Sequence, residues 1–411
     1  MTMTTFYLGL LTAIITQSTL LTAALLTSKR SDKTANYLLS GLIVLFSYYT
    51  LVKILCNTDK IFQYPYFIRT YLPVFVLACA FLLLYSKALL SPGFRFTRKE
   101  CLHFVPFGIY TLFLLPFYLS DPAAKFAYLS SLSSKSFTVP LVVELAFFNG
   151  VFFVYFRLSY RTIRQHQRRI KDVFSNLENV KCDWLRNLLS AFGLIWMAAL
   201  LRMLTSFAGE VDEIKFLTPL LLCATIYLIG WYALRQPELF TDLRHDLSPG
   251  SAGILPASFT FSPETTFAGK VPAVQPAQSR QHPKYAYSSL TSQDIAGYKE
   301  QLLTYLEQEK PYTDNELKVQ DLAGHLGIPS YQLSQIINTE LQRNFYDLIN
   351  SYRIEEAQRR LIDPTNQHFT ILAIAYDVGF NSKSAFNSAF KKHANMTPSQ
   401  YKKSSVVVAH L

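Results

Sequence analysis

Two stretches near the C-terminal end carry amide, hydroxyl and ammonium side chains at helical spacing. The amides of Asn and Gln can pair with adenine through two hydrogen bonds, and Lys can contact guanine or a phosphate. These residue types therefore predict groups that read base edges and contact the backbone of duplex DNA. The competing interpretation is a pair of ordinary solvated helix faces, which carry the same residue types. The stretches offer Ser330, Tyr331, Gln332, Ser334 and Gln335, and then Lys383, Ser384, Asn387, Ser388, Lys391 and Lys392.

The elements that would position the first stretch are a helix, a tight turn and a second helix. The apolar stripe of the first helix is Val319, Leu322, Ala323 and Leu326. Gly327 and Pro329 interrupt that helix, and we expect the hydroxyl of Ser330 to cap the next one. This order is the helix-turn-helix pattern.

The same order recurs 52 residues later, measured from Leu322 to Ile374. TILAIAYDVGF supplies a helix with Gly379 in the turn, and NSKSAFNSAFKKH supplies the helix that follows. A longer helix, roughly 344–362, separates the repeats and ends before Pro364, while an earlier helix starts near 291 and ends at Pro311. The duplication predicts an all-helical C-terminal domain with two helix-turn-helix units.

The charge distribution supports a nucleic-acid contact only locally. The chain has a net charge of +11, yet residues 291–411 hold 12 basic and 13 acidic residues. After residue 381 this balance changes, because five lysines follow and no Asp or Glu. Such a strip is the expected footprint of phosphate binding. Arg343, Arg353, Arg359 and Arg360 are candidates for further phosphate contacts, and the alternative for Arg359 and Arg360 is an ordinary surface position.

Residues 310–405 resemble the AraC/XylS family of transcription regulators. The stretches that carry the resemblance are LAGHLGIPSYQLSQIIN and IAYDVGFNSKSAFNSAFKKHANMTPSQYKK, with both turn glycines, Phe380 and the TPSQY ending. The resemblance implies two helix-turn-helix units that bind successive major-groove faces of one site. The N-terminal half also looks like the seven-helix region of some membrane-embedded members. It departs from the commonest members, whose sensor is a soluble sugar-binding barrel, so their ligands are not carried over.

The N-terminal half is apolar enough to lie in a membrane. The chain is 50% hydrophobic and 16% charged, whereas soluble chains are about 25% charged. At about 20 apolar residues per crossing, we predict about seven transmembrane helices. No basic residue precedes Lys29, so the first run is predicted to be a retained helix rather than a signal peptide. The runs lie at 1–28, 34–52, 71–90, 102–119, 139–159, 185–206 and 216–234.

The predicted architecture has three parts. A transmembrane domain spans 1–236, a Pro/Ser/Ala-rich linker spans 237–290, and the DNA-binding domain spans 291–411. The linker contains seven prolines and no sustained period, which is typical of a disordered tether. The connection RTIRQHQRRIKDVFSNLENVKCDW is predicted to be a helical extension on the inner side that favours anionic lipid headgroups.

The basic residues orient the predicted helices. Fifteen Lys and Arg lie in the first, third and fifth connections, against five in the others. By the positive-inside rule, the N-terminus is outside and the C-terminal domain is cytoplasmic. The predicted location is therefore the inner membrane of a bacterium. The fifteen are Lys29, Arg30, Lys33, Lys87, Arg95, Arg98, Lys99, Arg157, Arg161, Arg164, Arg168, Arg169, Lys171, Lys181 and Arg186.

Three ionisable residues lie in the outer third of predicted crossings or at its edge: Lys53, Glu144 and Arg202. Charge is costly in a bilayer, so they are candidates for a signal site in which they pair with each other. The alternatives are snorkelling from helix ends and a structural ion pair.

Several other functions lack their motifs. The sequence contains no P-loop, HExxH or GxSxG motif, and its five cysteines form no CxxC pair. We therefore expect no enzyme activity, no metal and no cofactor. The expected partners are duplex DNA, the lipid bilayer, an unknown small-molecule or envelope signal, and a second copy of the chain. A transporter with a regulatory appendage and a passive membrane anchor remain as alternatives.

Overall fold

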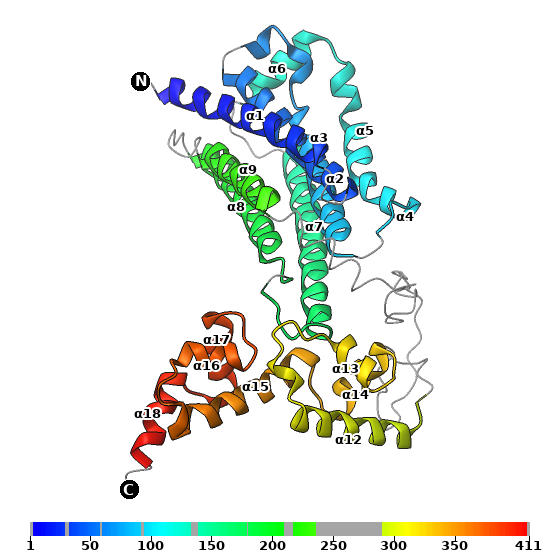
Figure 1. Ribbon diagram of the computed structural model, residues 1–411. Helices are drawn as coiled ribbons and strands as arrows, with labels where there is room; N and C mark the ends of the chain where they lie inside the picture. The colour runs from blue at the N-terminus through cyan, green and yellow to red at the C-terminus, as the bar shows by residue number, and fades with distance from the viewer. Residues whose placement is uncertain are drawn as a thin grey trace. The chain divides into compact units, whose positions relative to one another are not determined.

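The computed structural model describes residues 3–28, 33–57, 60–91, 94–132, 139–178, 180–208, 217–235 and 290–408. The predicted linker, 237–290, lies outside the described residues except for Leu290. The described chain is helical and holds one isolated antiparallel bridge, so the predicted all-helical fold class is confirmed (Figure 1). It divides into two compact units, which are Met1–His166 with Cys182–Arg244, and Gln167–Lys181 with His245–Leu411.

The first unit is a bundle of long apolar helices. Six helices in the described residues are long and apolar enough to cross a membrane, and Leu217–Tyr232 is a shorter apolar helix. These correspond to the seven predicted runs. The helices are α1 (Met3–Thr27), α2 (Lys33–Asn57), α3 (Tyr71–Leu90), α4 (Arg98–Cys101), α5 (Val105–Leu119), α6 (Pro122–Leu132), α7 (Val139–Lys171), α8 (Asp183–Ala208) and α9 (Leu217–Arg235).

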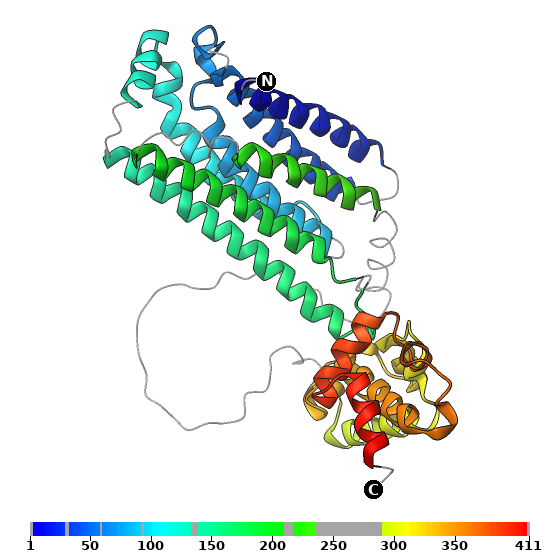
Figure 2. The same ribbon diagram turned by 90° about the vertical axis from the view of Figure 1, so that its left-hand side faces the viewer.

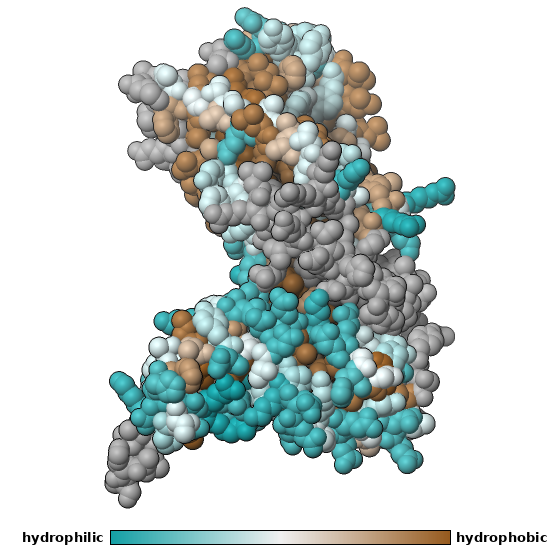
Figure 3. Space-filling view, in the orientation of Figure 1, coloured by the Kyte–Doolittle hydropathy of each residue, from teal (hydrophilic) through white to brown (hydrophobic). Residues whose placement is uncertain are grey.

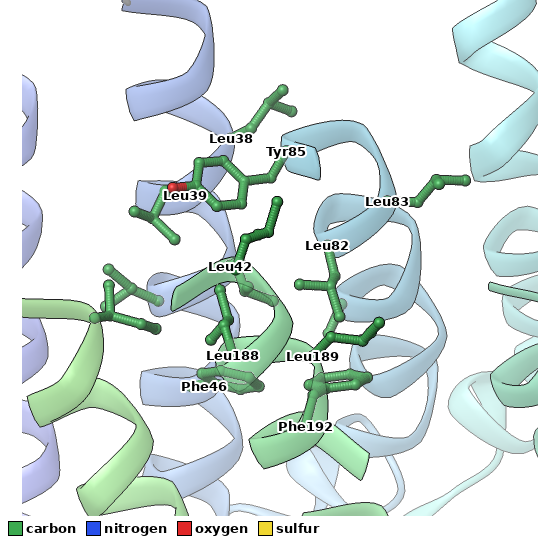
Figure 4. Close-up of a cluster of buried hydrophobic side chains, with 14 of the residues drawn as sticks. Leu38, Leu39, Leu42, Phe46, Leu82, Leu83, Tyr85, Leu188, Leu189 and Phe192 are labelled. Carbon is green, nitrogen blue, oxygen red and sulfur yellow. The ribbon is translucent and has the colours of Figure 1, made fainter. Parts of the chain in front are cut away.

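The core of this unit forms where α2, α3 and α8 meet. Figure 4 shows Leu42 and Phe46 of α2 directed toward Leu82 of α3 and Leu188 of α8. Aromatic rings extend the core, since Phe152 of α7 stacks on Trp196 of α8 at 4.4 Å between ring centroids. Close packing of side chains can hold helices together even where the surroundings of the helices are as apolar as their side chains.

The outer surface of this unit is also apolar. On α5, Leu112, Phe113 and Leu119 are 69%, 66% and 78% exposed. Figure 3 shows apolar residues gathered on the surface of the N-terminal helices. Contiguous exposed apolar surface marks a membrane or protein contact rather than a face in water.

The second unit contains the two predicted repeats. Its helices are α12 (Ser292–Gln308), α13 (Val319–His325), α14 (Ser330–Glu340), α15 (Phe345–Ile362), α16 (Ile371–Asp377), α17 (Lys383–Ala394) and α18 (Pro398–Val408), also visible in Figure 2. α13 and α14 form the first helix-turn-helix unit, α16 and α17 form the second, and α15 lies between them in sequence. Buried residues of α15, α16 and α17 make one apolar core that includes Ile354, Ile374 and Phe386.

Both turns depend on glycine. Gly327 and Gly379 have φ of +67° and +97°, a region that side chains with a Cβ rarely adopt. The local details differ from the prediction at Ser330, which is the first residue of α14 and not its cap. Pro329 holds the cap position, and no side chain caps this helix. In the second repeat Ser382 does cap α17, because its hydroxyl accepts a hydrogen bond from Ala385 N.

The connection after α7 departs from the predicted helical extension. α7 is helical only to Lys171. Residues 172–178 then leave the helix, and Phe174 forms the antiparallel bridge with Lys318. Residues Gln167–Lys181 therefore group with the C-terminal residues and not with the apolar helices that flank them in sequence.

Candidate functional site

α17 presents its predicted DNA-reading residues to solvent. Phe386, Ala389 and Phe390 turn into the core and are at most 6% exposed. The opposite side of the helix is polar, with no acidic residue between Lys383 and Ala394. The exposed residues on that side are Lys383, Ser384, Asn387, Ser388, Lys391 and Lys392. The structure thus brings all six predicted residues of the second repeat onto one helix with a positive face.

One of these lysines is already engaged. Lys392 Nζ lies 2.6 Å from Asp347 Oδ1 of α15. Burial alone would raise the pKa of the Asp347 carboxyl, but the hydrogen bond and charge of Lys392 lower it overall. A phosphate contact by Lys392 would have to compete with this carboxylate.

α14 presents its residues less openly. Ser330 and Gln332 are buried, at 5% and 8% exposed, while Tyr331, Ser334 and Gln335 are half-buried. Ser334 Oγ donates to the carbonyl of Asp172 at 3.4 Å, and Gln335 Oε1 is buried without a hydrogen-bond partner. The first repeat therefore offers fewer free groups than the second in this conformation.

The predicted phosphate contact by Arg353 is wrong, because its side chain is buried at 1% exposure. Its Nε donates to Tyr312 O at 2.6 Å, and its Nη2 donates to Asp314 O at 2.6 Å. Burial in this site lowers the pKa of the guanidinium to about 10, and the nearby charge of Asp314 partly offsets the shift. Arg353 is thus a structural cation that joins α15 to the segment before α13.

Arg359 and Arg360 also serve the fold. Both lie against Glu356, at 2.8 and 3.0 Å, and Lys310 Nζ approaches the same carboxylate at 3.3 Å. Arg343 Nη1 donates to Ser351 Oγ at 3.0 Å while its residue remains exposed. The residue type alone does not distinguish an arginine that binds phosphate from one that forms ion pairs or hydrogen bonds within the domain.

The three predicted signal residues occupy different surroundings. Lys53 Nζ lies over the rings of Tyr71 and Tyr49, at 4.5 and 5.5 Å from their centroids. Arg202 is half-buried on α8. Glu144 is paired with Arg69, which is not one of the three predicted signal residues: Arg69 Nη2 lies 2.5 Å from Glu144 Oε1.

The pair of Arg69 and Glu144 is enclosed by aromatic residues. The Tyr110 hydroxyl donates to Glu144, and the guanidinium of Arg69 lies over the rings of Tyr128 and Phe117 at 4.8 and 5.4 Å. Arg69 Nε is buried without a hydrogen-bond partner. The sequence signal that could have identified Arg69 is its place among tyrosines in YPYFIRTY, next to an apolar run.

The segment before α8 contributes a residue that sequence reasoning missed. The hydroxyls of Ser382 and Ser384, at the start of α17, donate to the carboxylate of Glu178. The two partners are more than 200 residues apart in sequence. No local pattern around Glu178 predicts this contact.

Tandem helix-turn-helix units with an exposed, positive second helix define a class of DNA-binding protein. Residues 322–404 match the family model described as a helix-turn-helix domain. The melibiose operon regulatory protein of Escherichia coli is 32% identical over 108 residues, which cover 26% of this chain and 34% of that protein. The raffinose operon transcriptional regulatory protein of Pediococcus pentosaceus is 29% identical over 86 residues, which cover 21% of this chain and 30% of that protein.

A further relative is an uncharacterized HTH-type transcriptional regulator of Pseudoalteromonas carrageenovora, 28% identical over 89 residues, 22% of this chain and 51% of that protein. The chain thus spans about a third of the melibiose regulator's length. The C-terminal region is thus similar to the helix-turn-helix domain of AraC/XylS-type regulators, which supports the resemblance seen in the sequence. These relatives are named as regulators and not as enzymes, in agreement with the expectation of no enzyme activity.

Proposed function

We propose that this protein is a membrane-bound transcription regulator that binds a specific DNA sequence through α14 and α17. The observation that carries the proposal is the exposed face of α17, where amide, hydroxyl and ammonium groups stand together with no acid. Amides read base edges and lysines contact phosphates, so one helix supplies specificity and affinity. The names of the relatives support regulation of transcription.

The membrane location rests on the first unit. Six helices have the length and hydropathy of a crossing, and large apolar side chains cover the outside of the bundle. The bias of Lys and Arg toward alternate connections supports a cytoplasmic C-terminal unit. Reporter fusions at the C-terminus and in the connections would test this orientation, and a periplasmic C-terminus would rule out the proposal.

The DNA-binding step is tested with the full-length protein in lipid nanodiscs. We expect a random duplex pool to yield an enriched sequence. Asn387→Ala should relax the preference at one base pair, a loss of about 1–3 kcal/mol. Lys391→Ala should instead weaken binding to all duplexes and reduce the salt slope by about 1. Gln367→Ala, an exposed amide outside both predicted reading helices, is the matched control. Failure to enrich any sequence would refute the proposal.

The paired charges of the apolar unit favour signal reception over a passive anchor. Ionisable groups inside an apolar bundle are expensive and usually serve a function. Arg69 and Glu144 form such a pair, with Tyr110 bonded to the same carboxylate. We propose that an outside or intramembrane signal acts on this pair. If Glu144→Gln and Arg69→Gln leave reporter expression unchanged under every growth condition that alters it in the wild type, the passive anchor is correct.

A further inference from the structure

Residues 172–178 dock on the C-terminal helices through their backbone. Val319 N donates to Val173 O at 2.9 Å, and Ser175 N donates to Leu317 O at 3.2 Å. These two bonds flank the bridge between Phe174 and Lys318. Val173, Phe174 and Ser175 are all buried, at 5%, 8% and 1% exposed. A short added strand of this kind is a recurrent way for a peptide to bind a protein edge.

The docked segment also completes the site of Arg353. The guanidinium donates to Ser175 O at 3.2 Å and to Ser175 Oγ at 3.1 Å. A buried guanidinium needs acceptors for its five N–H groups, because each unpaired donor costs free energy. The same arginine bonds the carbonyls of Tyr312 and Asp314, so the segment shares one polar centre with α15 and the loop before α13.

The end of the segment places a carboxylate at the start of α17. Glu178 accepts hydrogen bonds from Ser382 and Ser384, the cap and an early residue of the predicted second reading helix. The N-terminus of a helix attracts anions, and a DNA phosphate is an anion of the same charge sign. A cavity of about 170 Å³ lies beside this contact and is lined by Glu178 of the segment and by Ser384 and Ser388 of α17, among others.

The segment reaches the other repeat as well. The carbonyl of Asp172 accepts a hydrogen bond from Ser334 of α14. Ser334, Ser384 and Ser388 are all residues that the sequence predicts to face DNA. One stretch of chain therefore contacts or faces predicted reading residues of both helix-turn-helix units.

We propose that residues 172–178 are an internal competitor of DNA, docked across both reading helices with Glu178 in the place of a phosphate. The proposal rests on the proposed function, since it concerns regulation of the same surface. The segment is covalently continuous with α7 on one side and α8 on the other. A displacement of α7 relative to α8 would pull the segment away from α14 and α17 and leave their predicted DNA-reading residues free. The apolar unit could control DNA binding in this way.

The first test removes the competing charge in the full-length protein in nanodiscs. Glu178→Gln should bind the selected duplex about fivefold more tightly, because a like charge no longer faces the phosphates. The matched control is Asp183→Asn, which removes the same charge five residues later, where the carboxylate lies 3.5 Å from Arg186. If Glu178→Gln and Asp183→Asn bind alike, the competitor role of Glu178 is refuted while the proposed function stands.

The second test locks the segment in place. Phe174 and Lys318 face each other without a hydrogen bond between their own backbones. In this type of antiparallel pair the Cα atoms lie about 4.5 Å apart, which is within the range of a disulfide. Phe174→Cys with Lys318→Cys should form a disulfide on oxidation, lose at least about tenfold in DNA affinity, and regain it with reductant. Each single cysteine variant, treated alike, should show no such change.

The two tests separate the possible failures. Undiminished binding by the oxidised double variant would overturn the inference and leave DNA binding intact. Absence of binding by the wild type, by Glu178→Gln and by the reduced double variant would overturn the proposed function and the inference with it.

Discussion

The two turn glycines provide a matched pair of substitutions with different expected costs. Both have positive φ, so Gly327→Ala and Gly379→Ala each place a Cβ in a left-handed conformation, at about 1–2 kcal/mol. The surroundings differ. A Cβ on Gly327 meets no atom within 4 Å, whereas a Cβ on Gly379 lies 2.5 Å from Tyr312 O and 2.9 Å from both Arg353 Nε and Thr313 O.

The atoms around Gly379 cannot move at low cost in free energy, because those that a Cβ would contact belong to backbone carbonyls and to the buried guanidinium of Arg353. We therefore expect Gly379→Ala to cost about 3–5 kcal/mol in total, which is about 2–3 kcal/mol more than Gly327→Ala.

Amide hydrogen exchange measures this difference in the full-length protein in nanodiscs. The slowest amides of α15 report the free energy of opening the C-terminal unit. Gly379→Ala should accelerate their exchange far more than Gly327→Ala, while peptides of α2 and α3 serve as internal controls. Equal acceleration by the two substitutions would refute the argument that the crowded carbonyls, and not φ alone, require glycine at 379.

Three further predictions concern buried charges. Arg353→Lys should destabilise the C-terminal unit by about 3 kcal/mol in the same exchange measurement, because an ammonium cannot span the acceptors on Tyr312, Asp314 and Ser175; wild-type exchange rates would contradict this. Glu356→Gln should cost about 1–3 kcal/mol at neutral pH. Burial opposes the charge of Glu356, but the hydrogen bond of Arg360 and the nearby cations lower its pKa below the ordinary value of 4.5. The stabilisation by Glu356 is therefore complete above pH 4.5 and is lost as the pH falls through the pKa of Glu356 in the folded protein. A stability difference between Glu356→Gln and wild type that persisted in strong acid would oppose this assignment. Glu144→Gln leaves Arg69 without its carboxylate and should lower the Tm of the detergent-solubilised protein, a loss of about 3 kcal/mol; an unchanged Tm would show that the pair adds nothing to stability.

Local patterns were enough to predict the elements and the exposed face of α17. Glycine at 327 and 379 marked the turns, and the apolar spacing around Phe386 and Phe390 fixed which side of α17 faces solvent. These features depend on residues close in sequence. The predicted reading role of each residue stays a prediction.

Contacts between distant parts of the chain could not be predicted in this way. Arg353 was assigned to phosphate because a basic residue on a helix has the same local signature whether it is buried or exposed, and its acceptor Ser175 is 178 residues away. The ion pair between Glu144 and Arg69 could not be predicted for the same reason, since Arg69 lies 75 residues earlier and in a loop. Ser330 failed as a cap because Pro329, with its fixed φ, already supplies the start of α14.

The bridge at Phe174 relies on main-chain atoms, and that has a consequence for genetics. Most substitutions at Val173, Ser175, Leu317 or Val319 keep the backbone amide and carbonyl groups. The two backbone hydrogen bonds can therefore persist when the side chains at these positions change. Proline is the exception, because it removes the donor. Random mutagenesis for regulators that are permanently active should accordingly recover proline at 175 or 319 more often than at neighbouring positions.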